Sequence, residues 1–147
     1  MSMIDITSKT IIYREAQAEG IIRLRPDTVK KIIEGRIEKG DVFTVSRIAA
    51  INAVKKTPDL LPLCHNIPIT HVNVDFNVIG DDRIMVRVTV KSTAKTGVEM
   101  EALAGVSTAL LNIWDMVKKY EKDEMGQYPF TAIEYIRVIS KVKQEYK

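Results

Sequence analysis

The chain has 147 residues, of which 46% are hydrophobic and 28% charged, with a formal net charge of +3 at pH 7. This length fits one domain, residues 1–147, that buries a core without disulfides. The small, scattered positive charge does not indicate a nucleic-acid-binding protein, but it suits an anionic ligand such as a phosphate ester. The sequence has neither a signal-peptide pattern nor a membrane-spanning stretch, and Cys64 is its only cysteine, so we expect a cytoplasmic protein.

The first third of the chain predicts a strand followed by a helix. Residues Thr10–Leu24 alternate with period two, which places Arg14 on one face together with small and apolar side chains. Pro26 is typical of the first turn of a helix, and Gly35 is a suitable residue to end it. The side chains of this helix expected to face the core are Val29, Ile32 and Ile33.

A second helix and a hairpin follow. Asp41 is the expected N-cap of a helix that runs to about Thr57, where Pro58 ends it. Two alternating segments then flank the turn Gly80-Asp81-Asp82, which predicts an antiparallel hairpin with one buried and one polar face. The expected buried residues are Val72, Val74, Phe76 and Val78, and after the turn Ile84, Val86, Val88 and Val90.

The rest of the chain predicts a long helix over about Val98–Lys119 and a last strand over Ala132–Val142. The order is therefore strand, two helices, two strands, helix, strand. This order favours an α+β fold in which an antiparallel sheet is covered on one face by helices.

Standard nucleotide and metal motifs are missing from the sequence. There is no Walker loop, no Rossmann glycine pattern and no paired-cysteine zinc motif. His65 and His71 are the only histidines, so we predict no metal site, although Mg²⁺ could arrive with the phosphates of a ligand.

Three segments are more polar than packing requires, and each has two interpretations. Leu61–Pro68 is either a rigid ligand-binding stretch or a buried connector. The carboxylates of Lys95–Glu101 either complement a helix dipole or recognise the donor-rich edge of a guanine-like base. Asp115 and Lys118, three positions apart on a helix, form either a surface ion pair or an acid–base pair in a cleft.

Taken together, these segments and their spacing resemble one known family. The matching stretches are Arg14-Glu15-Ala16, Ile33-Glu34-Gly35-Arg36, Lys39-Gly40-Asp41-Val42, Leu61-Pro62-Leu63-Cys64-His65, Lys95 to Leu103, and Asp115-Met116 followed by Lys118. In this order the chain resembles the molybdenum-cofactor biosynthesis protein C (MoaC) family, the cyclic pyranopterin monophosphate synthases. The resemblance extends from Asp5 to Lys141.

The resemblance implies a ferredoxin-like α+β fold and a lyase of molybdenum-cofactor (molybdopterin) biosynthesis. The substrate would be 3′,8-cyclo-7,8-dihydro-GTP, and the products would be cyclic pyranopterin monophosphate and pyrophosphate. No cofactor is implied beyond Mg²⁺ with the triphosphate. The expected assembly is a homohexamer, a trimer of dimers with pockets at subunit interfaces, which binds neither nucleic acid nor membranes.

The same resemblance implies the site residues. Asp115, Lys118 and Lys39 would be catalytic, and Lys141 would lie close to Lys39. The substrate would contact Leu63, Cys64, His65, Glu99, Met100, Glu101, Arg14 and Lys141. Rearranging rings at nitrogen requires groups that donate and accept protons, and a buried lysine beside an aspartate can do so.

The spacing along the long helix adds a geometric constraint. Glu101 and Asp115 would stand roughly 21 Å apart on one helix, farther than a pterin reaches. Either different subunits supply them to one pocket, or Glu101 leaves the helix. Two other functions remain open: a catalytically idle relative that binds pterins or nucleotides, and a structural subunit that binds no GTP-derived ligand.

Overall fold

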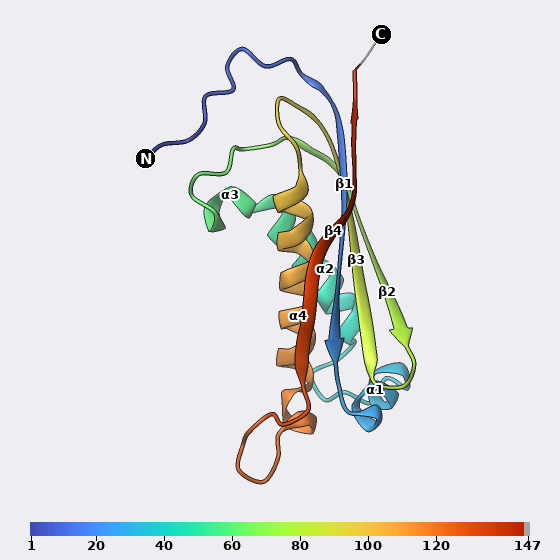
Figure 1. Cartoon of the computed structure of the whole chain (residues 1–147). Coiled ribbons are helices and arrows are strands. Elements are labelled where there is room, and N and C mark those ends of the chain that lie inside the picture. Colours follow the sequence, from blue (N-terminus) through green and yellow to red (C-terminus); the bar gives the residue numbers. More distant parts are fainter. Residues whose placement is uncertain (146–147) are drawn as a thin grey trace.

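A four-stranded antiparallel sheet has helices packed on one of its faces (Figure 1). This computed structural model describes residues 1–145. The elements are β1 (Ile12–Arg23), α1 (Pro26–Ile33), α2 (Val42–Lys55), α3 (Thr57–Leu60), β2 (Ile69–Ile79), β3 (Arg83–Ala94), α4 (Glu99–Glu121) and β4 (Ala132–Gln144). The strand order β2-β3-β1-β4, with helical crossovers before β2 and β4, is the ferredoxin-like arrangement. The predicted α+β fold, with helices covering one face of the sheet, is confirmed.

The core lies between the central strands and α4. On β1, Ile12, Arg14 and Ala16 are buried on the face toward the helices, as the alternation predicts. Gly20 lies where β1 and α4 approach most closely: a Cβ there would come within 2.8 Å of the Val106 and Leu110 side chains. A glycine is therefore required at this position for the helix to pack on the sheet.

The short helix α1 corrects one prediction about the core. Val29 and Ile32 are buried, but Ile33 is 61% exposed and does not belong to the predicted buried stripe. Successive helical residues are turned by about 100° from each other, so Ile33 points away when Ile32 faces the core. A helix of only two turns has room for a narrow apolar stripe.

The second helix begins as predicted and ends differently. The Asp41 carboxylate accepts a hydrogen bond from the Thr44 N–H at 3.1 Å, so it is the N-cap. The helix ends at Lys55, and Thr57–Leu60 forms a separate turn of helix in which Pro58 lies near the start. Pro58 therefore begins a helix instead of ending one, because proline's missing N–H is tolerated in a first turn.

The hairpin is confirmed, but its buried face is narrower on β2. β3 alternates between buried and half-buried residues over its whole length. On β2 only Val74 is fully buried, and Val78, predicted to be buried, is 38% exposed. β2 is one of the two edge strands, and Val78 and Ile79 at its end near the turn are exposed, whereas Val74 in its middle is buried.

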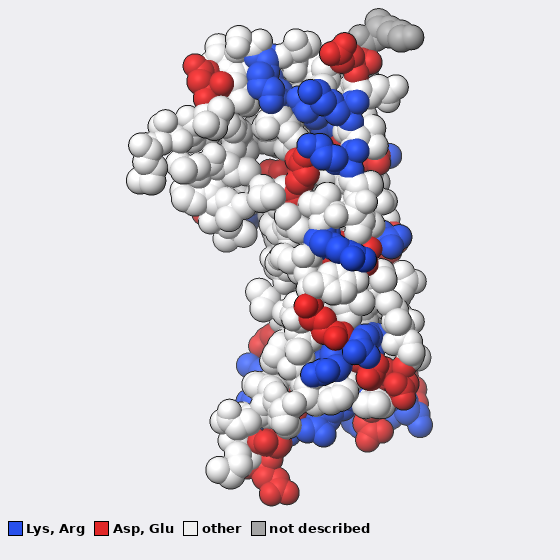
Figure 2. All heavy atoms as spheres, in the orientation of Figure 1, with Lys and Arg blue, Asp and Glu red and all other residues white. Residues whose placement is uncertain are grey.

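Charge is unevenly distributed on the face drawn in Figure 2. Lys and Arg side chains gather at the end of the molecule where α4 begins and β4 ends, whereas both signs intermix at the opposite end. A surface with this concentration of positive charge favours binding of an anion at the first of these ends.

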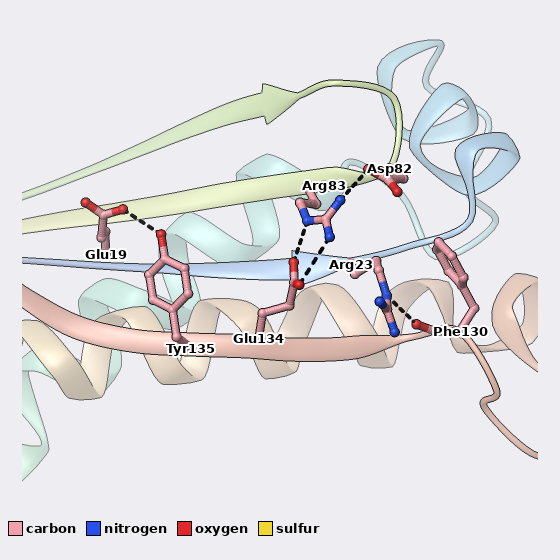
Figure 3. Close-up of polar contacts among 7 residues, drawn as sticks. All are labelled: Glu19, Arg23, Asp82, Arg83, Phe130, Glu134 and Tyr135. Carbon is pink, nitrogen blue, oxygen red and sulfur yellow. Dashed lines mark hydrogen bonds and ion pairs between the residues drawn. The ribbon is translucent and has the colours of Figure 1, made fainter.

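Polar side chains link three strands across the sheet (Figure 3). The Arg83 guanidinium on β3 pairs with Asp82 at 3.0 Å and with Glu134 on β4 at 2.5 Å. The Tyr135 hydroxyl on β4 donates to Glu19 on β1 at 3.0 Å. These contacts bind β4 to the rest of the sheet, which fixes the strand that holds Lys141.

A buried carboxylate joins the far end of α4 to two other elements. Glu121 is fully buried, and its oxygens accept hydrogen bonds from the Arg25 N–H at 3.1 Å and from the Thr131 hydroxyl at 2.6 Å. The Thr28 hydroxyl also donates to it. Glu121 thus connects the end of α4 to the start of α1 and to the segment before β4.

Replacing Glu121 by alanine should lower the free energy of unfolding by about 3–5 kcal/mol, because two buried hydroxyls and the half-buried Arg25 N–H lose their acceptor. Urea denaturation at neutral pH measures the change. Glu124→Ala, in the exposed loop that follows, is the control and should change it by less than about 0.5 kcal/mol. Similar values for the two variants would contradict the structural role of Glu121.

Candidate active site

The structure brings the three predicted catalytic residues together near the end of α4. The Asp115 carboxylate accepts from Lys118 Nζ at 3.1 Å on one oxygen and from Lys39 Nζ at 3.1 Å on the other. Lys39 Nζ also donates to the Asp115 carbonyl oxygen at 3.0 Å. Lys118 lies one helical turn after Asp115, whereas Lys39 comes from the turn between α1 and α2.

The two lysines of this cluster stabilise the charge of Asp115. Hydrogen bonds from Lys39 and then from Lys118 lower the pKa of Asp115, so this carboxylate is ionised at neutral pH. The Lys118 side chain is 45% exposed in the single chain. An ionised aspartate that holds two ammonium groups offers both positive charge and a proton donor to a ligand.

A cavity of about 180 Å³ lies at this cluster. It is lined by Glu38, Lys39, Asp115, Met116, Lys118, Lys119 and Tyr120. A larger open hollow of about 490 Å³ beside it is lined by charges of both signs and by none of the predicted site residues. We assign the chemistry to the smaller cavity because the proton-transferring groups are there.

At the opposite end of α4, a thiol meets a buried carboxylate. The Cys64 thiol, in the loop after α3, donates to Glu101 at 3.8 Å, and Glu101 is only 2% exposed. Burial, followed by the nearby Glu101 charge, raises the pKa of Cys64, so it is a thiol at neutral pH and not a nucleophilic thiolate. Burial also raises the pKa of Glu101 above the ordinary glutamate value.

The raised pKa of Glu101 predicts a pH-dependent stability. The contribution of this group is fully present below its ordinary pKa of 4.5 and is lost as the pH rises through the raised folded value. Glu101→Gln cannot ionise and should therefore remove this decline. Urea denaturation of both proteins between about pH 4 and 8, at fixed protein concentration, measures it. Parallel pH profiles would contradict the prediction.

Glu99 and Lys141 form an ion pair beside this carboxylate. Lys141 Nζ on β4 lies 2.5 Å from the Glu99 carboxylate. Burial opposes ionisation of Glu99, but the hydrogen bond from Lys141 contributes to a net lowering of its pKa. At 1.5 Å per residue along α4, Glu99 lies roughly 24 Å from Asp115. We predicted that Lys141 lies close to Lys39. Within one chain it does not, because β4 places Lys141 at the start of α4.

Arg14 supports the loop before α4. Its guanidinium donates to the carbonyl oxygens of Ala94 at 3.5 Å and Lys95 at 3.3 Å, and the residue is buried. Its charge also contributes to lowering the pKa of Glu99. In the single chain, Arg14 acts as a positive group beneath the Lys95 loop, close to Glu99.

The N-terminal segment lies against the same end of α4, which sequence reasoning missed. The Ile4 carbonyl is 2.7 Å from Nε2 of His65, and the Thr7 carbonyl accepts from Lys95 Nζ at 2.8 Å. In Figure 1 the segment arches over the α3–β2 and β3–α4 loops. The Ile4 carbonyl thus orients His65, a predicted substrate-binding residue, and the Thr7 carbonyl orients Lys95 at the start of the loop before α4.

The remaining predicted substrate contacts, Leu63 and Met100, are both exposed at this end of α4. The predicted residues therefore form two groups at opposite ends of one helix. The first contains the catalytic residues Lys39, Asp115 and Lys118. The second, which we call the recognition group, contains Arg14, Leu63, Cys64, His65, Glu99, Met100, Glu101 and Lys141. Glu101 lies within α4, so it does not leave the helix to join the first group.

Comparison with known proteins identifies the family of this chain. The MoaC family model matches residues 3–144. The chain belongs to the MoaC family.

Relatives in this family are similar over nearly the whole chain. A probable cyclic pyranopterin monophosphate synthase of Saccharolobus solfataricus is 57% identical over 143 residues, 97% of this chain and 95% of the relative. A probable cyclic pyranopterin monophosphate synthase of Pyrococcus furiosus is 56% identical over 145 residues, which are 99% of this chain and 92% of the relative. A protein of Methanothermobacter thermautotrophicus is named a probable cyclic pyranopterin monophosphate synthase accessory protein. It is 58% identical over 143 residues, which are 97% of this chain and 89% of the relative.

Two further features bear on what this MoaC-family chain can bind. Within residues 1–145, no group of three or more His, Cys, Asp and Glu side chains is arranged to hold a metal ion. In the same part of the chain, no helix has both the length and the apolarity needed to cross a membrane.

Proposed function

We propose that this chain is a cyclic pyranopterin monophosphate synthase. It converts 3′,8-cyclo-7,8-dihydro-GTP to cyclic pyranopterin monophosphate and pyrophosphate, a lyase reaction of molybdenum-cofactor biosynthesis in the cytoplasm. The observation that supports this most strongly is the contact of Asp115 with both Lys39 and Lys118. Membership of the MoaC family and the names of the relatives support the same activity.

The catalytic group suits proton transfer without redox chemistry. Opening and closing rings at nitrogen requires a proton donor and an acceptor in contact with the reacting atoms. Lys118 donates a proton as an ammonium group and takes one back as the resulting amine, and the ionised Asp115 orients it and stabilises its charge. Lys39, on the other oxygen of Asp115, stabilises negative charge on the phosphates as pyrophosphate departs.

The recognition group suits the base and the phosphates of the substrate. The Glu101 and Glu99 carboxylates accept hydrogen bonds from the donor-rich edge of a guanine-like ring. Leu63 and Met100 offer apolar contact, while Cys64 and His65 supply polar contacts beside it. Arg14 and Lys141 attract the triphosphate, and Mg²⁺ would enter bound to that triphosphate.

We further propose that each active site is shared by two subunits. The two groups are roughly 24 Å apart along α4, whereas one ligand must contact both. The cavity of 180 Å³ is below the roughly 300 Å³ of a typical ligand pocket, so a second subunit would complete it. A two-fold dimer that places α4 helices antiparallel would bring the recognition group of one copy to the catalytic group of the other. Three such dimers make the proposed hexamer.

Rescue of a bacterial strain that lacks its own synthase tests the proposed function. Expression of the wild-type chain should restore molybdenum-cofactor production, and Lys118→Ala should not. Failure of the wild type to rescue, although it is folded and present, would favour the idle relative or the structural subunit.

A further inference from the structure

The turn that carries Lys39 is attached to α4 through a tyrosine hydroxyl. The Glu38 N–H, one residue before Lys39, donates to Tyr120 Oη at 2.9 Å. Tyr120 lies in the last turn of α4, five positions after Asp115 and two after Lys118. The end of α4 therefore carries both the Asp115–Lys118 pair and Tyr120, whose hydroxyl holds the turn that contains Lys39.

Lys39 needs such support because its own segment has no regular structure. Residues 34–41 connect α1 to α2, and Gly40 has φ +117°, which reverses the chain directly after Lys39. The Lys39 side chain is 47% exposed and long, so holding its Nζ on Asp115 is entropically unfavourable. The position of the turn decides whether that contact forms.

The other attachments of the turn are weaker or less direct. Lys119 pairs with the Glu38 carboxylate, but both side chains are largely exposed, and such pairs contribute little. Ile37 is buried, and its carbonyl accepts from the Gly40 N–H at 3.1 Å, a hydrogen bond within the turn that does not attach the turn to α4. The hydrogen bond from the Glu38 backbone to Tyr120 is directional and lies next to Lys39.

The Tyr120 ring is itself held in place. It packs against the core, and Lys31 and Lys119 lie over the ring with Nζ 5.9 and 5.2 Å from its centre. Tyr120 also lines the 180 Å³ cavity together with the catalytic group. Its hydroxyl is therefore a preorganised acceptor.

We propose that Tyr120 is a positioning residue that sets Lys39 against Asp115, an inference that rests on the proposed function. It acts on Lys39 through the Glu38 backbone N–H. A displacement of about 1 Å of a catalytic group is enough to slow a reaction substantially. Losing the Tyr120 hydroxyl therefore slows the chemical step and leaves substrate binding at the recognition group unchanged.

Tyr120→Phe tests this, because it removes the acceptor and keeps the ring. We expect kcat to fall about three- to tenfold and KM to change less than about twofold. In a Lys39→Ala background the same change should have no further effect. Hydrogen exchange of the Glu38 amide should be faster in Tyr120→Phe. The matched control is Tyr128→Phe. Tyr128 lies in the loop after α4, and its ring packs on Trp114 of that helix. This change should leave kcat and the exchange of the Glu38 amide unchanged.

An unchanged kcat in Tyr120→Phe would overturn the inference, as would an equal loss in the Lys39→Ala background. A loss of kcat with an unchanged Glu38 amide would also overturn it, since the effect would not pass through the turn. Wild-type protein without turnover would instead overturn the proposed function, and the amide exchange would then decide alone whether Tyr120 holds the turn.

Discussion

Replacing Lys118 by alanine is expected to lower kcat by about 10²–10⁴-fold, the range for loss of a general acid–base group. Lys118 is one of the two ammonium groups on Asp115, and no other residue of α4 pairs with that carboxylate. KM should change little, because the recognition group at the other end of α4 stays intact. Steady-state kinetics on 3′,8-cyclo-7,8-dihydro-GTP, with both products followed, measures the loss.

This variant should keep its fold and assembly. The Lys118 and Asp115 side chains are 45% and 56% exposed, and exposed ion pairs contribute little to stability. Lys122→Ala, one turn farther along and exposed, is the control and should retain wild-type kcat within about twofold. Wild-type activity in Lys118→Ala would remove this residue from the mechanism.

Mixing two inactive variants should restore activity if subunits share each site. Glu101→Gln damages the recognition group and Lys118→Ala the catalytic group. In randomly paired dimers, half are mixed, and each mixed dimer has one site with both groups intact. About a quarter of wild-type activity is therefore expected after joint refolding or co-expression. The rate of product formation by the mixture, compared with each variant alone, measures it.

The matched control for this mixture uses two variants of the same group. Asp115→Asn mixed with Lys118→Ala should stay inactive, because every site then has one damaged catalytic group. Recovery in the first mixture alone supports shared sites. No recovery in either mixture, with mixed dimers demonstrated by mass spectrometry, would contradict the two-subunit site.

The sequence predicted the elements of the fold well where local chemistry determines them. The strict alternation of β3 and the N-cap Asp41 each depend on neighbouring residues, and both are confirmed. Ile33 and Val78 were predicted to be buried, yet their exposure depends on where a short helix and an edge strand lie in the fold. Apolar periodicity cannot distinguish a covered face from one that extends beyond its partner.

The amino-acid sequence alone predicted less of the site than of the fold. The spacing of Asp115 and Lys118 predicts that they pair, but Lys39 comes from a distant turn, and only the family resemblance placed it with them. Nothing in the sequence distinguishes Glu121 or Tyr120 from ordinary residues at a helix end. Their roles depend on contacts with α1 and with the turn after it, which exist only in the folded chain.

Turnover of the purified wild-type protein with 3′,8-cyclo-7,8-dihydro-GTP tests the central claim most directly. Pyrophosphate and cyclic pyranopterin monophosphate, followed together, should appear in equal amounts. Binding of the substrate without either product would contradict the claim and identify a binding protein of the same fold. Neither binding nor products would leave the chain as a structural member of the family.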